Sequence, residues 1–96
     1  MPLSRALEVL GIAKEQWERE LGVGNAQAER LVTTKWKARQ VELNSIYGQT
    51  LESDQNPLKV NRISLLNAAK GQCDRALASR AKRSSEEDVE GFVFLF

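Results

Sequence analysis

Histidine is absent from this chain of 96 residues, and cysteine occurs once, as Cys73. These facts exclude a disulfide framework within one chain, a zinc site that uses histidine, and a Ser-His or Cys-His nucleophilic pair. Aromatic residues make up only 6% of the chain, and no window approaches the roughly 18 apolar residues that cross a bilayer. The N-terminal residues lack the apolar run of a secretory signal. We therefore expect a cytoplasmic protein that is not an enzyme, binds no cofactor or metal, and does not enter a membrane.

The composition is that of one small globular domain. Hydrophobic residues make up 42% of the chain and charged residues 28%, which is too apolar for a disordered chain. The net charge is only +1, but residues 25–83 carry eleven basic and five acidic side chains, whereas residues 84–96 carry four acidic and no basic ones. We therefore divide the chain into a helical domain, residues 1–83, and an acidic and aromatic tail, residues 84–96.

Two short helices are predicted near the N-terminus. Ser4 is a candidate N-cap for the first, because an apolar stripe follows it directly and extends to Leu10. Gly11 is expected to weaken that helix locally. The second is predicted over residues 14–20, because the two glycines of Leu21–Gly24 indicate a turn.

The longest periodic segment covers residues 25–47 and is followed by Gly48, a natural C-terminal stop. Residues 49–62 are rich in polar residues and show no apolar period, so they are predicted to form a long connecting loop. Apolar residues return at helical spacing after this loop, which predicts a third main helix over residues 63–83.

The C-terminal segment is expected to interrupt that helix. Ser84 follows its last basic turn as a stop, Gly91 should break any further helix, and Phe92–Phe96 is a short run that favours β-structure. The predicted fold is therefore all-α, a small domain of three main helices with a short C-terminal tail or strand.

Three stretches of the chain resemble the J-domain family of chaperone partners. Ala6–Ile12 is similar to the Leu-Gly-Val/Ile end of that family's first helix, and Val32–Leu43, with Lys35-Trp36-Lys37 inside it, is similar to its basic second helix. Leu66–Lys70 is similar to the Ile-Asn-x-Ala of its third helix, and the resemblance as a whole spans roughly residues 4–80. The alternative is an unrelated three-helix domain with the same periodicity.

The chain departs from the J-domain pattern where that family acts. J-domains stimulate the ATPase of a DnaK-type partner through a His-Pro-Asp triplet between the second and third helices, and this chain contains no histidine. The corresponding segment runs from Gln49 to Pro57. The resemblance therefore implies a J-like module that serves as an adaptor, scaffold or inhibitor and does not stimulate an ATPase.

The predicted long helix carries a set of basic side chains that we expect to form an electrostatic contact surface: Arg30, Lys35, Lys37 and Arg39. A protein partner is the first interpretation. A small helical nucleic-acid-binding protein is the alternative, since basic residues also gather near the end of the third helix at Arg75, Arg80, Lys82 and Arg83. The sequence leaves both open.

The aromatic end of the chain has two interpretations. Its side chains either cover the helical core or dock on a partner protein, and the docking interpretation makes Phe92, Phe94, Leu95 and Phe96 the anchor. A chain with an uncovered aromatic tail is also expected to be able to self-associate. Trp17, Trp36 and Cys73 lie on apolar stripes and are predicted to belong to the core.

Overall fold

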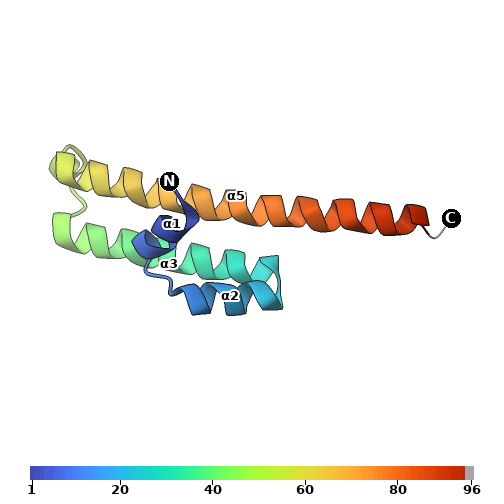
Figure 1. Ribbon diagram of the computed structural model, residues 1–96. Coiled ribbons are helices and arrows are strands. Elements are labelled where there is room, and N and C mark those ends of the chain that lie inside the picture. The colour runs from blue at the N-terminus through green and yellow to red at the C-terminus, as the bar shows by residue number, and fades with distance from the viewer. Residues whose placement is uncertain (95–96) are drawn as a thin grey trace.

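The computed structural model describes the backbone of residues 1–94 and the side chains of residues 1–52 and 54–81. This part of the chain contains four longer helices and one of a single turn, and no strand (Figure 1), so the all-α prediction is confirmed. The helices are α1 (Leu3–Leu10), α2 (Lys14–Val23), α3 (Asn25–Tyr47), α4 (Leu51–Asp54) and α5 (Pro57–Phe94).

The helices α3 and α5 form an antiparallel hairpin, and the two short N-terminal helices pack onto it (Figure 1). Helix α1 contacts α5 and α3, whereas α2 packs on α3. Helix α5 extends well beyond the other helices at its C-terminal end. Its 38 residues correspond to about 57 Å at 1.5 Å per residue, which accounts for most of the 63 Å long axis of the molecule.

The core lies where α1 and α3 meet the first two thirds of α5, and Trp17 of α2 extends it on the side of α3. On α5 the buried side chains recur three or four residues apart, so they lie on one helix face. Trp17 and Cys73 are buried as predicted, and Trp36 packs against the core while half-buried. The buried apolar residues are Ala6, Leu7, Leu10, Ile12, Trp17, Ala28, Val32, Leu66, Ala69, Cys73 and Leu77.

The N-terminal helices begin and end differently from the prediction. Helix α1 begins at Leu3 after Pro2, and no side chain caps it, so Ser4 is not its N-cap. Gly11 ends this helix, because its φ of +74° is a left-handed conformation that glycine adopts without strain. Helix α2 continues to Val23, beyond the predicted end at residue 20.

The predicted loop over residues 49–62 is wrong, since α5 already begins at Pro57. The Asn56 side chain accepts a hydrogen bond from the backbone N–H of Leu58 at 2.9 Å, and Pro57 stands at the first helical position. Asn56 is thus the N-cap and Pro57 the first residue of the helix. Proline suits this position because it has no N–H that would need a hydrogen-bond partner there.

Lys59 connects the remaining linker to this first turn of α5. Its side chain is buried, and its Nζ donates to the carbonyl of Gly48 at 2.6 Å and to the carboxylate of Asp54 at 3.2 Å. The Lys59 ammonium group therefore binds the residue after α3 and the single turn α4 to the start of α5.

The predicted stop at Ser84 and break at Gly91 are also absent, because the backbone of α5 is helical without interruption to Phe94. A glycine inside a helix costs only about 1 kcal/mol relative to alanine, and adding residues to an existing helix needs no new nucleation. The helical backbone thus continues across the predicted boundary between residues 83 and 84. Leu95 and Phe96 lie outside the described residues.

Candidate functional site

The four basic residues predicted on the long helix do not form one surface. Successive residues of an α-helix are rotated by about 100°. Arg30 and Lys37 are seven residues apart and lie on one face of α3. Lys35 and Arg39 are four residues apart and lie about 140–180° around the helix from that pair. The predicted contact surface is therefore divided between two sides of α3.

The exposed pair lines a shallow hollow on the outer face of α3. Arg30 and Lys37 stand there with Glu29 and threonine side chains, around a volume of about 360 Å³. The acidic neighbour lowers the local positive potential, and both basic side chains are exposed to water, where charge contacts are weak. This face by itself offers little to hold a ligand.

Lys35 and Arg39 are both half-buried, and Arg39 belongs to a different place in the fold. Its guanidinium lies against Gly11, where an added Cβ would be 2.8 Å from one of its nitrogens, and it forms an ion pair with Glu42. Glycine at the end of α1 therefore leaves the space in which this arginine lies. Arg39 stands at the rim of a groove that three helices form.

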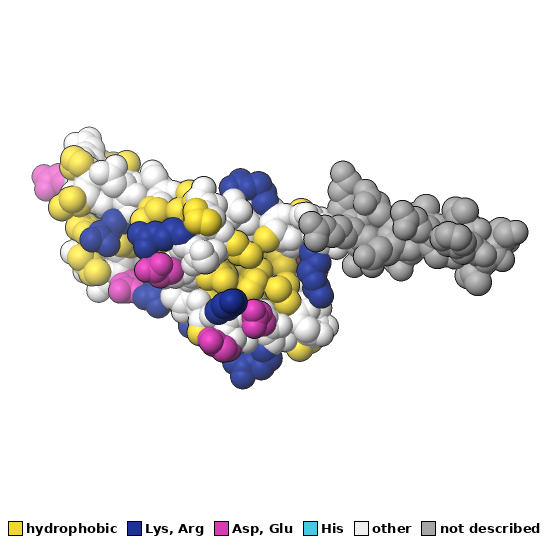
Figure 2. Space-filling model, in the orientation of Figure 1, with side chains coloured by type: hydrophobic (Ala, Val, Ile, Leu, Met, Phe, Trp, Pro, Cys, Tyr) yellow, Lys and Arg dark blue, Asp and Glu magenta, His cyan; other side chains and the backbone are white. Residues whose placement is uncertain are grey.

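The groove lies between α1, the C-terminal half of α3 and the N-terminal half of α5, and its volume is about 420 Å³. Figure 2 shows hydrophobic atoms on this side of the molecule, with Lys or Arg and Asp or Glu side chains beside them. The apolar lining is Val9, Leu43, Ile46, Leu65 and Leu66, joined by Tyr47, and the charged lining is Arg5, Glu8, Arg39, Glu42 and Arg62.

Two apolar side chains of this groove remain open to water. Ile46 is 64% exposed and Leu65 is 38% exposed, although both are large hydrophobic residues on helices of the hairpin. Scattered exposed apolar residues are ordinary, but a concave cluster with a charged rim is typical of a surface that another chain covers.

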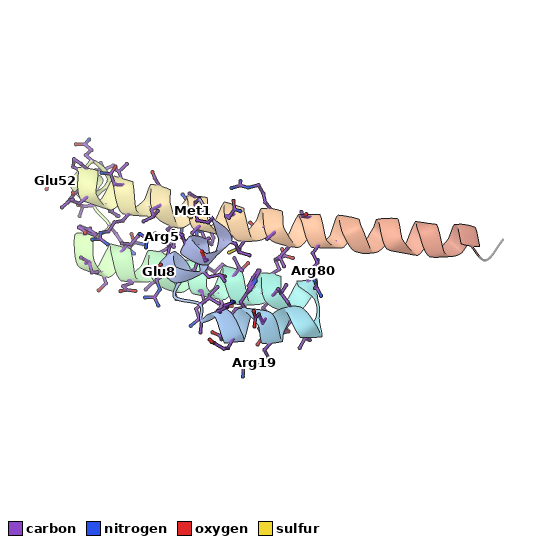
Figure 3. The ribbon with its side chains drawn as sticks, viewed as in Figure 1. Met1, Arg5, Glu8, Arg19, Glu52 and Arg80 are labelled. Carbon is purple, nitrogen blue, oxygen red and sulfur yellow. The ribbon has the colours of Figure 1, made fainter. Side chains whose placement is uncertain are left out.

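The charges of the groove are paired except for one. Arg5 and Glu8 form an ion pair at 3.2 Å on α1 (Figure 3), and Arg39 pairs with Glu42 on α3. Arg62 has no ion-pair partner among the described residues. The groove thus presents an apolar floor beside one uncompensated positive charge.

Sequence reasoning did not identify this groove. The predicted loop over residues 49–62 includes Arg62, and Arg5 and Glu8 lie within the first predicted helix. The Asn56-Pro57 pair could have placed Arg62 in the second turn of a helix. No sequence signal, however, brings α1 beside the two hairpin helices at this point.

Trp36 helps to hold the hairpin together. Its Nε1 donates to the Asn67 side chain at 3.1 Å, and the Nζ of Lys70 lies 5.2 Å from the centre of its ring. Lys70 also pairs with Asp74 at 2.8 Å. Because each polar atom here has a partner on the neighbouring turn or helix, this cluster stabilises the packing of α3 on α5.

A second polar contact fastens the start of α3 to α5. The Asn25 side chain donates to the carbonyl of Leu77 at 3.0 Å and accepts from Arg80 at 2.7 Å. Figure 3 shows Arg80 on the side of α5 that faces the start of α3. Of the basic residues predicted near the end of the third helix, Arg80 is thus engaged within the fold, and the side chains of Lys82 and Arg83 lie outside the described part.

Cys73 is fully buried, and burial raises the pKa of its thiol to about 11, with Asp74 adding to the shift and Lys70 opposing it. A buried thiol that stays protonated at neutral pH is a poor nucleophile and a poor metal ligand. No group of three or more residues that bind metals occurs among the described side chains. Cys73 therefore belongs to the core.

Of the predicted aromatic anchor, the structure describes only part of the backbone. The backbone at Phe92 and Phe94 belongs to α5, while their side chains, and all of Leu95 and Phe96, lie outside the described residues.

In the part of the chain that is described, no helix combines the length and apolar character that crossing a membrane requires. Comparisons with family models, with curated proteins and with solved structures found no match.

Proposed function

We propose that this chain is a non-enzymatic binding module that holds a segment of another protein in the groove between α1, α3 and α5. The groove carries the proposal, because it combines exposed apolar side chains, Ile46 and Leu65, with an unpaired cation, Arg62. A segment with apolar side chains on one face and an acidic group beside them would cover the first and neutralise the second.

The J-domain resemblance belongs to the same proposal. The first stretch on which the resemblance rests covers the end of α1 and the two residues after it, and the other two stretches lie on α3 and α5. The segment between α3 and α5 contains no histidine. The proposed role is therefore that of an adaptor, scaffold or inhibitor without ATPase stimulation. A buried, unpaired Cys73 suits a reducing compartment, so we place the protein in the cytoplasm.

The test selects ligands from a library of random peptides displayed on phage, with the full chain as bait. Affinities of selected peptides are then measured by fluorescence anisotropy for the full chain and for Ile46→Asp. Ile46 lines the groove and is largely exposed, so the substitution leaves the core intact. We expect a loss of about tenfold or more, since covering one large apolar side chain contributes about 1.5–3 kcal/mol.

The matched control is Val41→Asp on the same helix. Val41 is 68% exposed and does not line the groove, so this variant introduces the same charge outside the proposed site and should bind as the unaltered chain does. Equal losses in both variants, or no loss in either, would contradict the proposal. Duplex DNA that binds with a steep salt dependence, while selected peptides ignore Ile46→Asp, would favour the nucleic-acid alternative.

A further inference from the structure

The groove and the C-terminal segment of the chain are complementary in chemistry. The groove has an apolar floor and the unpaired Arg62, while residues 84–96 carry four acidic residues, no basic residue and the run Phe92–Phe96. Resting on the proposed function, we propose that the groove of one copy of this chain receives residues 84–96 of a second copy.

The segment that would fill the groove cannot come from the same copy. Helix α5 is continuous from Pro57 to Phe94, and Arg62 and Glu86 stand on it 24 residues apart, which is about 36 Å. Figure 1 shows the C-terminal end of α5 directed away from α1 and from the loop side of the hairpin. A straight helix therefore carries its own acidic segment away from its own groove and makes it available to another copy.

The unsupported length of α5 points the same way. Leu77 is the last buried apolar residue on the described part of this helix, and the backbone continues beyond α2 and α3 to Phe94. Continuing an existing helix needs no new nucleation, but most of the stability of a helix in a protein comes from packing of its apolar face. A second copy whose groove covers residues 84–94 would supply that packing.

The experiment measures the mass of the full chain by sedimentation velocity over a wide range of protein concentration. We expect an assembly that grows with concentration, and Arg62→Glu should weaken it by about tenfold or more, as loss and reversal of a close charge contact do. Arg62 is exposed and has no ion-pair partner in the described part of the chain, so its reversal does not disturb the core. Arg30→Glu, an equal change on the outer face of α3, is the matched control and should leave the assembly unchanged.

Reversing the charges on both sides tests whether Arg62 contacts the acidic residues of the C-terminal segment. A second variant, with Glu86→Lys, Glu87→Lys and Glu90→Lys, should also assemble more weakly alone than the unaltered chain, because its basic segment meets Arg62. A mixture of this variant with Arg62→Glu should assemble again, since every groove then meets a segment of opposite charge.

The outcomes separate this inference from the proposed function. A chain that stays monomeric at all concentrations, an assembly that Arg62→Glu leaves intact, or a mixture that does not reassemble would overturn the inference. If the chain is monomeric but selected peptides still depend on Ile46, the groove binds a different protein and the proposed function stands. If the peptides also ignore Ile46, both are contradicted.

Discussion

Cys73 is the only thiol of the chain, and its burial makes its reactivity a measure of whether α5 packs on α1 and α3 as described. The thiolate is the form that attacks a disulfide reagent. A pKa of about 11, compared with an ordinary 9.0, leaves about a hundredfold fewer thiolates at pH 8. The reagent also needs access to a side chain with 0% exposure. Both factors act against reaction in the folded state.

The expected slowing follows from comparing two routes to reaction. A thiol with no exposed surface reacts mainly when the fold opens, and opening of a domain with about 5 kcal/mol of stability leaves roughly one molecule in several thousand open. Reaction through opening therefore proceeds at least about a thousandfold more slowly than in an unfolded chain. We expect reaction with a coloured aromatic disulfide at pH 8 to be slowed to this degree.

The assay compares the full chain with a short peptide of residues 70–76, which carries the same cysteine in the same local sequence. A native rate within tenfold of the peptide rate would refute the described packing of α5. A rate that rises to the peptide value in urea, along with the loss of helical circular dichroism, would connect the protection of Cys73 to the fold.

The raised pKa of Cys73 also predicts how stability depends on pH. The folded state prefers the protonated thiol, so the stabilisation is complete below pH 9 and is lost as the pH rises through 11. The loss is about 1 kcal/mol by pH 10 and about 3 kcal/mol above both values. Urea unfolding of the chain beside Cys73→Ala should show this difference between pH 8 and pH 10. A parallel decline in both proteins would contradict it.

Three further predictions test the packing by urea unfolding monitored by circular dichroism. Leu10→Ala empties a fully buried site and should cost about 3–5 kcal/mol, whereas Leu58→Ala, at a residue that is 62% exposed, should change stability by less than about 0.5 kcal/mol; similar effects would place the core elsewhere. Gly11→Ala should cost about 1–2 kcal/mol because φ there is +74°, and a neutral result would deny that conformation. Asn25→Ala removes two hydrogen bonds to α5 and should cost about 1–3 kcal/mol, and an unchanged midpoint would show that they contribute nothing.

The local sequence was sufficient for the helical class and for much of the core. Trp17, Cys73 and the stripe at Leu66, Ala69 and Leu77 could be assigned to the interior because apolar residues at helical spacing must face one side. Gly48 also indicated the end of the long helix, because glycine readily adopts the positive φ that helix ends often require. In the structure its φ is +85°. These features depend on neighbours within one or two turns.

The errors were made where local signals compete. Asn56 and Pro57 suit a loop and a helix start equally well, and in the structure the Asn56 side chain caps a helix whose side chains at Lys59 and Leu66 are buried. Ser84 and Gly91 are weak interruptions, costing about 1 kcal/mol or less each against continuation of an existing helix, so α5 passes through both.

The candidate site was decided by tertiary structure alone. The periodicity of α3 already separates Arg30 and Lys37 from Arg39, but only the crossing of α1 over the hairpin brings Arg39 beside Gly11. The groove with Arg62 at its rim combines residues from three helices distant in the sequence. The sequence by itself determined the all-α class and which face of each helix is apolar, because those depend on short-range periodicity. The tertiary structure decided which charges meet and which apolar side chains stay uncovered, because these depend on how whole helices pack.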